Sequence, residues 1–122
     1  MIDWEWVGFG PCVQDVMYLL VSSSHIDCLT DPAVEKALLA HYHAQLPAAA
    51  RASYPLPQLQ QDYELALLDF LRWLVCGKWK TLTPDGMRAD ANSYGRVLPN
   101  RSVPHARWLV QRANRILAGS GL

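Results

Sequence analysis

The chain has 122 residues, of which 51% are hydrophobic, and its eleven basic and eleven acidic side chains give a formal net charge of zero. This size and apolar content are those of one folded domain and exclude a disordered chain. The balanced charge argues against a nucleic-acid partner and a polybasic membrane anchor, and no apolar run approaches the roughly 20 residues that span a bilayer.

Residues 1–8 show a period of two, in which Ile2, Trp4 and Trp6 alternate with Asp3 and Glu5. This alternation of apolar and polar residues predicts a short β-strand. A single strand cannot satisfy its own backbone hydrogen-bonding groups. Because no other segment has a strand pattern, we expect the partner strand to lie upstream, outside this sequence.

Two helices are predicted next along the chain, after a turn at residues 8–11. The first runs from Cys12 to Ser22 and is apolar nearly all round, which predicts a buried helix. The second begins at Asp31 and Pro32, an N-cap residue followed by a proline in the first turn, and ends before Pro47.

In the second half of the chain, the sequence predicts a connector over residues 48–57. The longest helix is predicted over residues 58–76, and Gly77 ends it. A short helix is expected near residues 87–94, and the last helix over residues 104–118. The predicted fold class is therefore mainly α, one domain over residues 1–122 with a short strand at its front.

The cysteines indicate a cytoplasmic protein. Cys12, Cys28 and Cys76 are widely spaced and contain no C-x-x-C pair, so the pattern favours neither a zinc site nor a disulfide framework. We expect three reduced thiols, mostly buried, because a free cysteine usually packs as a small hydrophobic residue. The first residues carry no basic stretch of the kind that opens a signal peptide.

The candidate functional residues lie near the start of the sequence. Asp3 stands at the end of the predicted strand, and Asp15 stands in the first turn of the predicted helix that follows. A carboxylate at a strand end can hold a Mg²⁺ ion that bridges nucleotide phosphates. Mg²⁺ prefers one or two carboxylates together with phosphates and water. The simpler alternative is that Asp3 is only a strand-end charge and that Asp15 only stabilises a helix N-terminus.

Three segments resemble the aminoglycoside phosphotransferase and choline kinase superfamily, and most closely its ecdysteroid-kinase-like, CHK-type branch. The first combines IDWE (2–5), a glycine-rich turn and DVMYLL (15–20), and the others are LLAHYHAQL (38–46) and LQQDYELALL (59–68). They occur in the family's order and cover about residues 1–75. The resemblance implies the helical C-lobe of a protein-kinase-like fold.

The same resemblance implies roles for two residues. Asp3 matches the Asp that binds Mg²⁺ beside ATP, and Asp15 matches an Asp that hydrogen-bonds to the catalytic loop and steadies it. Glu5 occupies a variable position and is not expected to be a ligand. The acceptor in a full-length relative is a hydroxyl of a small molecule.

The sequence departs from the family pattern because the catalytic loop, H-x-D-x-x-x-x-N, precedes the IDWE segment and is absent here, as is the N-lobe. His25-Ile26-Asp27 reads H-x-D, but Pro32 stands where the loop has Asn, and its order along the chain is wrong. We therefore expect no general base in this chain, and neither Mg²⁺ nor ATP bound by it alone.

Histidine and tryptophan side chains offer no competing site. His41 and His43 are two residues apart on a helix and diverge, and His25 and His105 have no acidic or cysteine partners at ligand spacing. We expect all four to be solvated or hydrogen-bonded. The tryptophans could line a cation-binding pocket, but core packing or a surface facing the other lobe is favoured: Trp4, Trp6, Trp73, Trp79 and Trp108.

Two functions follow from these observations. The first is part of an ATP-dependent small-molecule kinase, inactive as this chain. The alternative is a non-catalytic helical module that binds a partner, derived from a truncated kinase-like gene. In both cases the strand and the apolar first helix would lack their covering lobe, so we expect an exposed apolar surface through which the chain self-associates.

Overall fold

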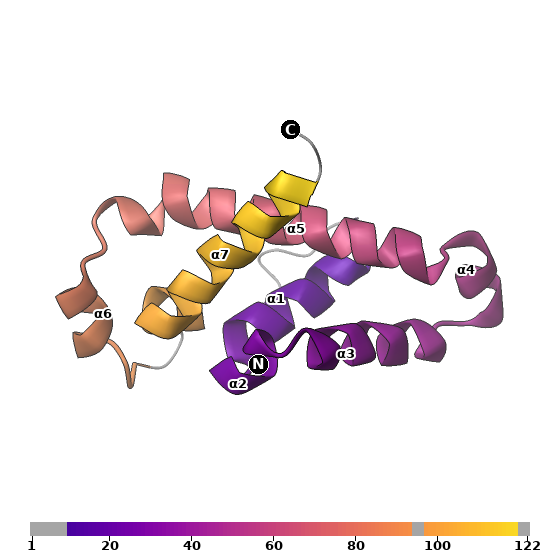
Figure 1. Cartoon of the computed structure of the whole chain (residues 1–122), viewed down its shortest axis with the longest axis horizontal. Helices are drawn as coiled ribbons and strands as arrows, with labels where there is room; N and C mark the ends of the chain where they lie inside the picture. Colours follow the sequence, from indigo (N-terminus) through magenta and orange to yellow (C-terminus); the bar gives the residue numbers. More distant parts are fainter. Residues whose placement is uncertain (1–9, 94–96, 120–122) are drawn as a thin grey trace.

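The computed structural model of the protein describes residues 10–93 and 97–119 (Figure 1). This part of the chain is mainly helical and contains no β-strand, which confirms the coarse fold class. The predicted strand at residues 1–8 lies outside the described residues. In the described residues no helix is both long and apolar enough to cross a membrane.

The described chain folds into seven α-helices and two short 3₁₀ turns. Their bounds are α1 Val13–Ser23, α2 Ile26–Thr30, α3 Pro32–Gln45, α4 Ala48–Ser53, α5 Leu56–Cys76, η1 Lys78–Lys80, α6 Pro84–Ala89, η2 Leu98–Asn100 and α7 Val103–Gly119.

Helix α5 is the central element and contacts α1, α3 and α7. Figure 1 shows α3 running alongside the first half of α5, with α4 closing this helical hairpin at one end, and α7 crossing α5 near its middle. Helix α2 packs between the start of α3 and α7. The helices therefore form one bundle around α5 rather than separate units.

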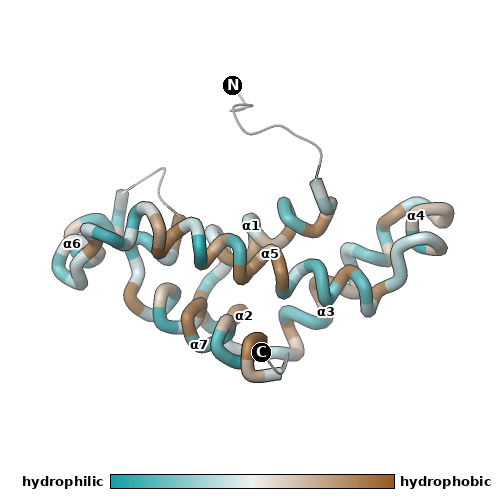
Figure 2. The backbone as a smooth tube through the Cα atoms, turned by 90° about the horizontal axis from the view of Figure 1, so that it is seen from above, coloured by the Kyte–Doolittle hydropathy of each residue, from teal (hydrophilic) through white to brown (hydrophobic). Residues whose placement is uncertain are grey.

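One apolar stripe of α5 supplies the centre of the core. Figure 2 shows brown, hydrophobic segments recurring along α5. The buried positions of this helix recur every three or four residues: Leu59, Tyr63, Leu67, Phe70 and Leu74. Helices α1, α3 and α7 add further buried side chains to the core, among them Val13, Met17, Val21, Leu39, Trp108, Leu109 and Ala113. This spacing of three to four is what buries one face of an amphipathic helix.

Several helix boundaries agree with the local sequence signals. The Asp31 carboxylate accepts a hydrogen bond from the Ala33 N–H at 2.9 Å and caps α3, and Gly77 ends α5. Helix α6 starts earlier than the predicted residue 87 because the Thr83 hydroxyl accepts from the Gly86 N–H at 3.1 Å. A side-chain cap of this kind satisfies one of the N–H groups that the first turn leaves without a partner.

The prediction of a connector over residues 48–57 is wrong, because α4 forms there and α5 begins at Leu56. Pro55 is the N-cap residue of α5 and Pro57 lies in its first turn. Proline is tolerated at these positions because the N–H groups there have no partner inside the helix. Helix α2 and the two 3₁₀ turns were not predicted either, since elements of three to five residues have too few positions to show a period.

Two expectations about burial are also wrong. Helix α1 is not buried all round, because Tyr18 is 49% exposed and Leu19 is 62% exposed. The three cysteines are exposed rather than mostly buried. Each cysteine lies at a helix end or in the short α2, where the chain is at the surface: Cys12, Cys28 and Cys76.

Candidate functional site

Asp15 is the candidate site residue that the structure describes, whereas Asp3 lies outside the described residues. Asp15 is exposed in the first turn of α1. The N-cap residue of α1, Cys12, makes no side-chain hydrogen bond to this turn. The positive end of the helix dipole therefore faces solvent beside a free carboxylate, an arrangement that stabilises negative charge.

Asp15 lies at a groove between α1 and α5, which we call the α1–α5 groove. Its volume is about 590 Å³, and its walls come from two helices: Gln14, Asp15, Met17 and Tyr18 from α1, and Ala66, Asp69, Phe70 and Trp73 from α5. A groove of this size is within the range of small-molecule and peptide sites.

Three aromatic rings make up much of the groove. Tyr18 meets Phe70 edge-on, with ring centroids 5.7 Å apart, and Phe70 stacks on Trp73 at 6.0 Å. Phe70 is buried, but Tyr18 and Trp73 are each about half exposed. Trp73 is therefore only partly packed against the core, and the alternative of a surface that faces another lobe stays a prediction.

The two carboxylates of the groove differ in their partners. Asp69 accepts hydrogen bonds from Arg72, with an Nε–Oδ1 distance of 2.8 Å. Asp15 forms no ion pair within residues 10–93 and 97–119. Asp15 is therefore the carboxylate of this surface that is free to accept a hydrogen bond from another group.

The start of α1 is tied to the end of α3. The Tyr42 hydroxyl donates to the Cys12 carbonyl oxygen at 3.4 Å. Burial is the largest of the effects that raise the pKa of Tyr42 to about 12, followed by the hydrogen bond and charge of the Cys12 side chain and by the negative charge of Asp15. Tyr42 thus stays a neutral donor at physiological pH, next to the turn that carries Asp15.

A chain of hydrogen bonds continues from α3 to the start of α5. His43 Nε2 donates to the Tyr54 carbonyl oxygen at 2.9 Å, and the Tyr54 hydroxyl donates to Asp62 Oδ2 at 2.7 Å. Gln58 donates to the other oxygen of Asp62 at 2.9 Å. Burial, followed by the hydrogen bond to Asp62, raises the pKa of Tyr54. His43 and Asp62, which lie in two of the resembling segments, therefore brace the α3–α5 hairpin.

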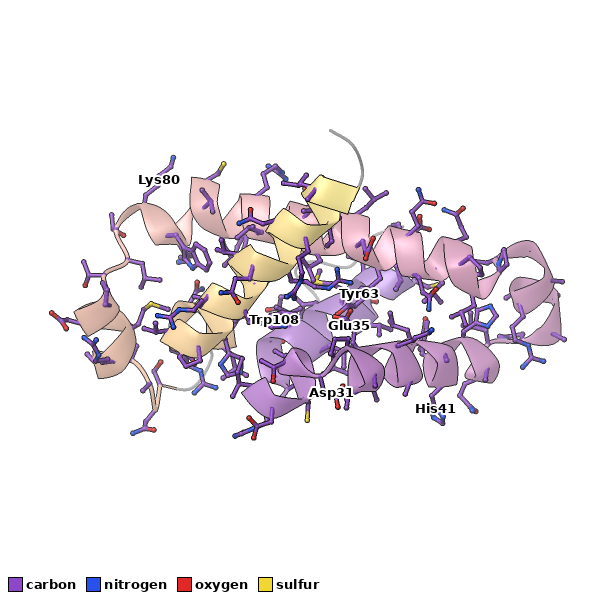
Figure 3. All side chains as sticks on the ribbon, in the orientation of Figure 1. Asp31, Glu35, His41, Tyr63, Lys80 and Trp108 are labelled. Atoms are coloured by element: carbon purple, nitrogen blue, oxygen red, sulfur yellow. The ribbon has the colours of Figure 1, made fainter. Side chains whose placement is uncertain are left out.

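The sequence did not predict a partly buried charge cluster on the other side of α5. Arg112 of α7 donates to Glu35 of α3 at 3.0 Å and to Glu64 of α5 at 2.9 Å, and the Tyr63 hydroxyl donates to Glu35 at 3.2 Å. Figure 3 shows Glu35 and Tyr63 facing each other between α3 and α5. No spacing rule could have found the cluster, because its members come from three separate helices.

The electrostatics of this cluster suit a structural role. Burial lowers the pKa of Arg112, but Glu35 and Glu64 outweigh that effect and the net shift is upward. Burial, followed by the charge of Glu35, raises the pKa of Tyr63. Both upward pKa shifts keep Arg112 charged and Tyr63 neutral at neutral pH, and the contacts of the cluster hold α3, α5 and α7 together.

The remaining histidines also act within the fold. His105 Nε2 donates to the Ser24 carbonyl oxygen at 3.1 Å, so its Nδ1 accepts from the Ser102 hydroxyl at 2.6 Å. His25 caps α2 by accepting from the Asp27 N–H at 3.4 Å, and both side chains are exposed. The H-x-D at residues 25–27 is therefore a helix cap.

A second, smaller hollow of about 320 Å³ lies between α2 and α7, lined by Ile26, Thr30, Val103, Pro104, Arg107, Trp108 and Gln111. The indole N–H of Trp108 is buried without a partner in the described structure. Nor do three His, Cys, Asp or Glu side chains of the described residues come together at a distance that would hold a metal ion.

Comparisons with protein-family models, with curated proteins and with solved structures find no match to this chain.

Proposed function

We propose that this chain is the helical C-terminal part of an ATP-dependent small-molecule kinase. The observation that carries the proposal is the contact between Tyr42 and Cys12, which joins the second resembling segment to the turn that holds Asp15. Segments 15–20, 38–46 and 59–68 also lie on α1, α3 and α5, which belong to one bundle. Asp15 remains exposed at the end of the bundle from which the chain leads back to Asp3.

In this proposal the two aspartates have separate roles. Asp3 binds Mg²⁺, which neutralises charge on the phosphates of ATP during phosphoryl transfer. Asp15, free of ion pairs in the described part of the chain, accepts hydrogen bonds from the backbone of a catalytic loop and orients it. The general base and the loop itself come from residues upstream of this sequence, so this chain alone is inactive.

The first test measures nucleotide binding by the purified chain. We expect no saturable binding of Mg-ATP below millimolar concentration by calorimetry, because positioning and charge stabilisation need both lobes. Tight binding would show that the site is complete in these 122 residues and would contradict the proposed division of the enzyme.

The second test uses a longer chain. The genomic sequence upstream of Met1 is translated in frame and searched for H-x-D-x-x-x-x-N, and a protein containing that segment is assayed for ATP consumption with a panel of small hydroxyl compounds. We expect Asp3→Asn to abolish turnover, and Glu5→Gln, two residues away on the same segment, to leave most of it. Equal effects of the two substitutions, or no upstream loop, would reject the kinase proposal.

A non-catalytic binding module is the second candidate. The large apolar side chains exposed over the described surface favour it: Tyr18, Leu19, Leu38, Leu65, Trp73, Val75, Val110 and Leu117. Two of them, Tyr18 and Trp73, lie together at the α1–α5 groove, and contiguous exposed apolar surface marks an interaction site. If the longer chain bound no nucleotide, that result would support the binding module over the kinase.

A further inference from the structure

A second stripe of α5, beside the one that enters the core, forms one wall of the α1–α5 groove. Its members lie at positions i, i+3, i+4 and i+7 of the helix: Ala66, Asp69, Phe70 and Trp73. Residues at these spacings share one face of a helix. The face runs for two turns, which at about 1.5 Å per residue is roughly 10 Å.

The groove lies where a third helix would pack against α1 and α5. Two packed helices leave between them a groove that can take the ridge of side chains of another helix. On the other side of α5 such a helix is present, because α7 packs on α5 and its Arg112 pairs with Glu35 of α3 and Glu64 of α5. Among the described residues, only those of α1 and α5 line the α1–α5 groove.

The aromatic rings of the groove provide the apolar contact surface. Tyr18 and Trp73 are 49% and 47% exposed, and both rings contact the buried Phe70. Trp and Tyr side chains are enriched among the residues that dominate binding energy at protein interfaces. A partner that covers these two rings therefore gains apolar contact.

The charge of the groove favours a basic partner. The described residues that line it include two exposed carboxylates, Asp15 and Asp69, and no basic side chain. A Lys or Arg side chain pairs with carboxylates and also interacts favourably with the faces of Trp and Tyr rings. A second copy of the chain is a less favourable occupant, because two grooves face to face would bring their carboxylates together.

We propose that the α1–α5 groove binds a basic amphipathic helix of another protein. Apolar residues of that helix at i, i+3 or i+4, and i+7 contact Tyr18, Phe70 and Trp73, and a flanking Lys or Arg pairs with Asp15 or Asp69. The span from i to i+7 is about 10 Å and matches the length of the α5 wall. This is the helix-in-groove mode of recognition.

The inference goes beyond the kinase proposal and does not rest on it. The kinase proposal gives no role to Tyr18, Asp69 or Trp73. Asp15 serves in both, since an ionised carboxylate accepts several hydrogen bonds. Peptide binding and phosphoryl transfer are measured separately, so failure of one proposal is distinguishable from failure of the other.

Selection of helical peptides by the full chain tests the proposal. The displayed library contains peptides of about 18 residues, long enough to form helices, with Leu at i, i+4 and i+7 and with Lys, Glu or Gln at the flanking positions. We expect selected peptides to carry Lys at least about threefold more often than Glu. Enrichment of Glu, or no enrichment above that obtained with the Trp73→Ser chain, would overturn the proposal.

Variants of the chain locate the binding surface. Fluorescence anisotropy of a selected, labelled peptide should give a Kd at least about tenfold weaker for Trp73→Ser. The matched control on the same helix is Leu65→Ser, an exposed apolar position outside the groove, which should change the Kd less than about twofold. Circular dichroism checks that both variants keep their helices. Equal losses in the two variants would place the peptide elsewhere.

The charge preference has its own test. The Lys-to-Glu version of the selected peptide should bind the unmodified chain at least about tenfold more weakly, and this ratio should shrink in Asp15→Asn with Asp69→Asn. Asp27→Asn, at an exposed carboxylate of α2, is the control and should keep the full ratio. An undiminished ratio in the double variant would refute pairing with the groove carboxylates.

Sedimentation of the chain alone distinguishes the remaining occupant. We expect Trp73→Ser to leave the sedimentation coefficient unchanged. A dimer that dissociates on this substitution would assign the groove to a second copy and reject a basic helix as its partner.

Discussion

The two sides of α5 carry similar types of residue, but one side is covered by other helices and the other side lines an open groove. Toward α3 and α7, Tyr63 and Glu64 meet Glu35 and Arg112, and the seam is closed by apolar packing and charge pairing. Toward the outer edge of α1, aromatic and acidic residues again lie together, but they line an open groove.

The difference comes from the number of elements on each side. The closed side has a third helix, α7, whose Arg112 supplies the cation that two glutamates need. The groove side has only α1 against α5 among the described elements, and its carboxylate Asp69 is paired within its own helix by Arg72. Whether an aromatic and acidic helix surface becomes part of the closed core or stays open as a groove therefore depends on which helices pack against it.

The largest expected effect sharpens this comparison on α5 itself. Leu67 is fully buried and Leu65, two residues earlier, is 57% exposed. We expect Leu67→Ala to lower the free energy of unfolding by about 2–5 kcal/mol, through lost burial and a cavity. Leu65→Ala should cost less than about 1 kcal/mol. Urea titrations followed by circular dichroism measure both, and equal costs would mean that burial does not distinguish these two positions of α5.

Removing the cation of the closed side should have the next largest effect. The Arg112 and Glu35 side chains are 20% and 12% exposed. Arg112→Met would therefore leave the nearly buried Glu35 carboxylate without its cation and lower the free energy of unfolding by about 1–3 kcal/mol. The exposed Arg115→Met is the matched control, with an expected change within about 0.5 kcal/mol. Adding Glu35→Gln to Arg112→Met should recover part of the loss in urea titrations; no recovery would contradict the pairing argument.

The smallest effect concerns the polar contact between α7 and the end of α1. Burial is the largest cause that lowers the pKa of His105; the hydrogen bond to the Ser24 carbonyl opposes it, and the electrostatic effects of His25 and Arg101 act in the same direction as burial. The folded state therefore binds this proton less readily than the unfolded chain, in which the histidine pKa is about 6.5.

The contribution of neutral His105 to stability is present above pH 6.5 and should decline as the pH falls below it. Comparison of urea midpoints at pH 7.5 and 5.5 measures the decline. His105→Gln should reduce that pH dependence, and His41→Gln, at an exposed position of α3, should retain it. If both variants kept the full dependence, the burial of His105 would not be its source.

Local sequence signals predicted the main helices well where a cap or a long period was present. Asp31 with Pro32 marked the start of α3, and eight apolar positions between Leu59 and Val75 marked α5. The same reasoning misread Pro55 and Pro57 as a linker, because proline both breaks a helix and starts one. The same reasoning also predicted that α1 is buried on all sides, because the hydropathy of a residue does not show whether another helix packs against it.

The candidate site was predictable only in part. Asp15 was selected from its position in the first turn of α1, and it lies there, exposed. Its neighbours Tyr18 and Trp73 were not connected with it, because they are 3 and 58 positions away and meet only when α1 packs on α5. The assignment of Asp3 to Mg²⁺ stays a prediction, as that residue lies outside the described structure.

The sequence by itself determined the helical class, the Asp31 cap of α3 and the stripe of α5 that enters the core, because these depend on backbone propensity and on periods within about twenty residues. Only the tertiary structure decided that Glu35, Glu64 and Arg112 form one cluster, that the cysteines are at the surface and that a groove opens beside Asp15. Those features depend on contacts between helices that are far apart in the chain, and no local pattern encodes which faces will meet.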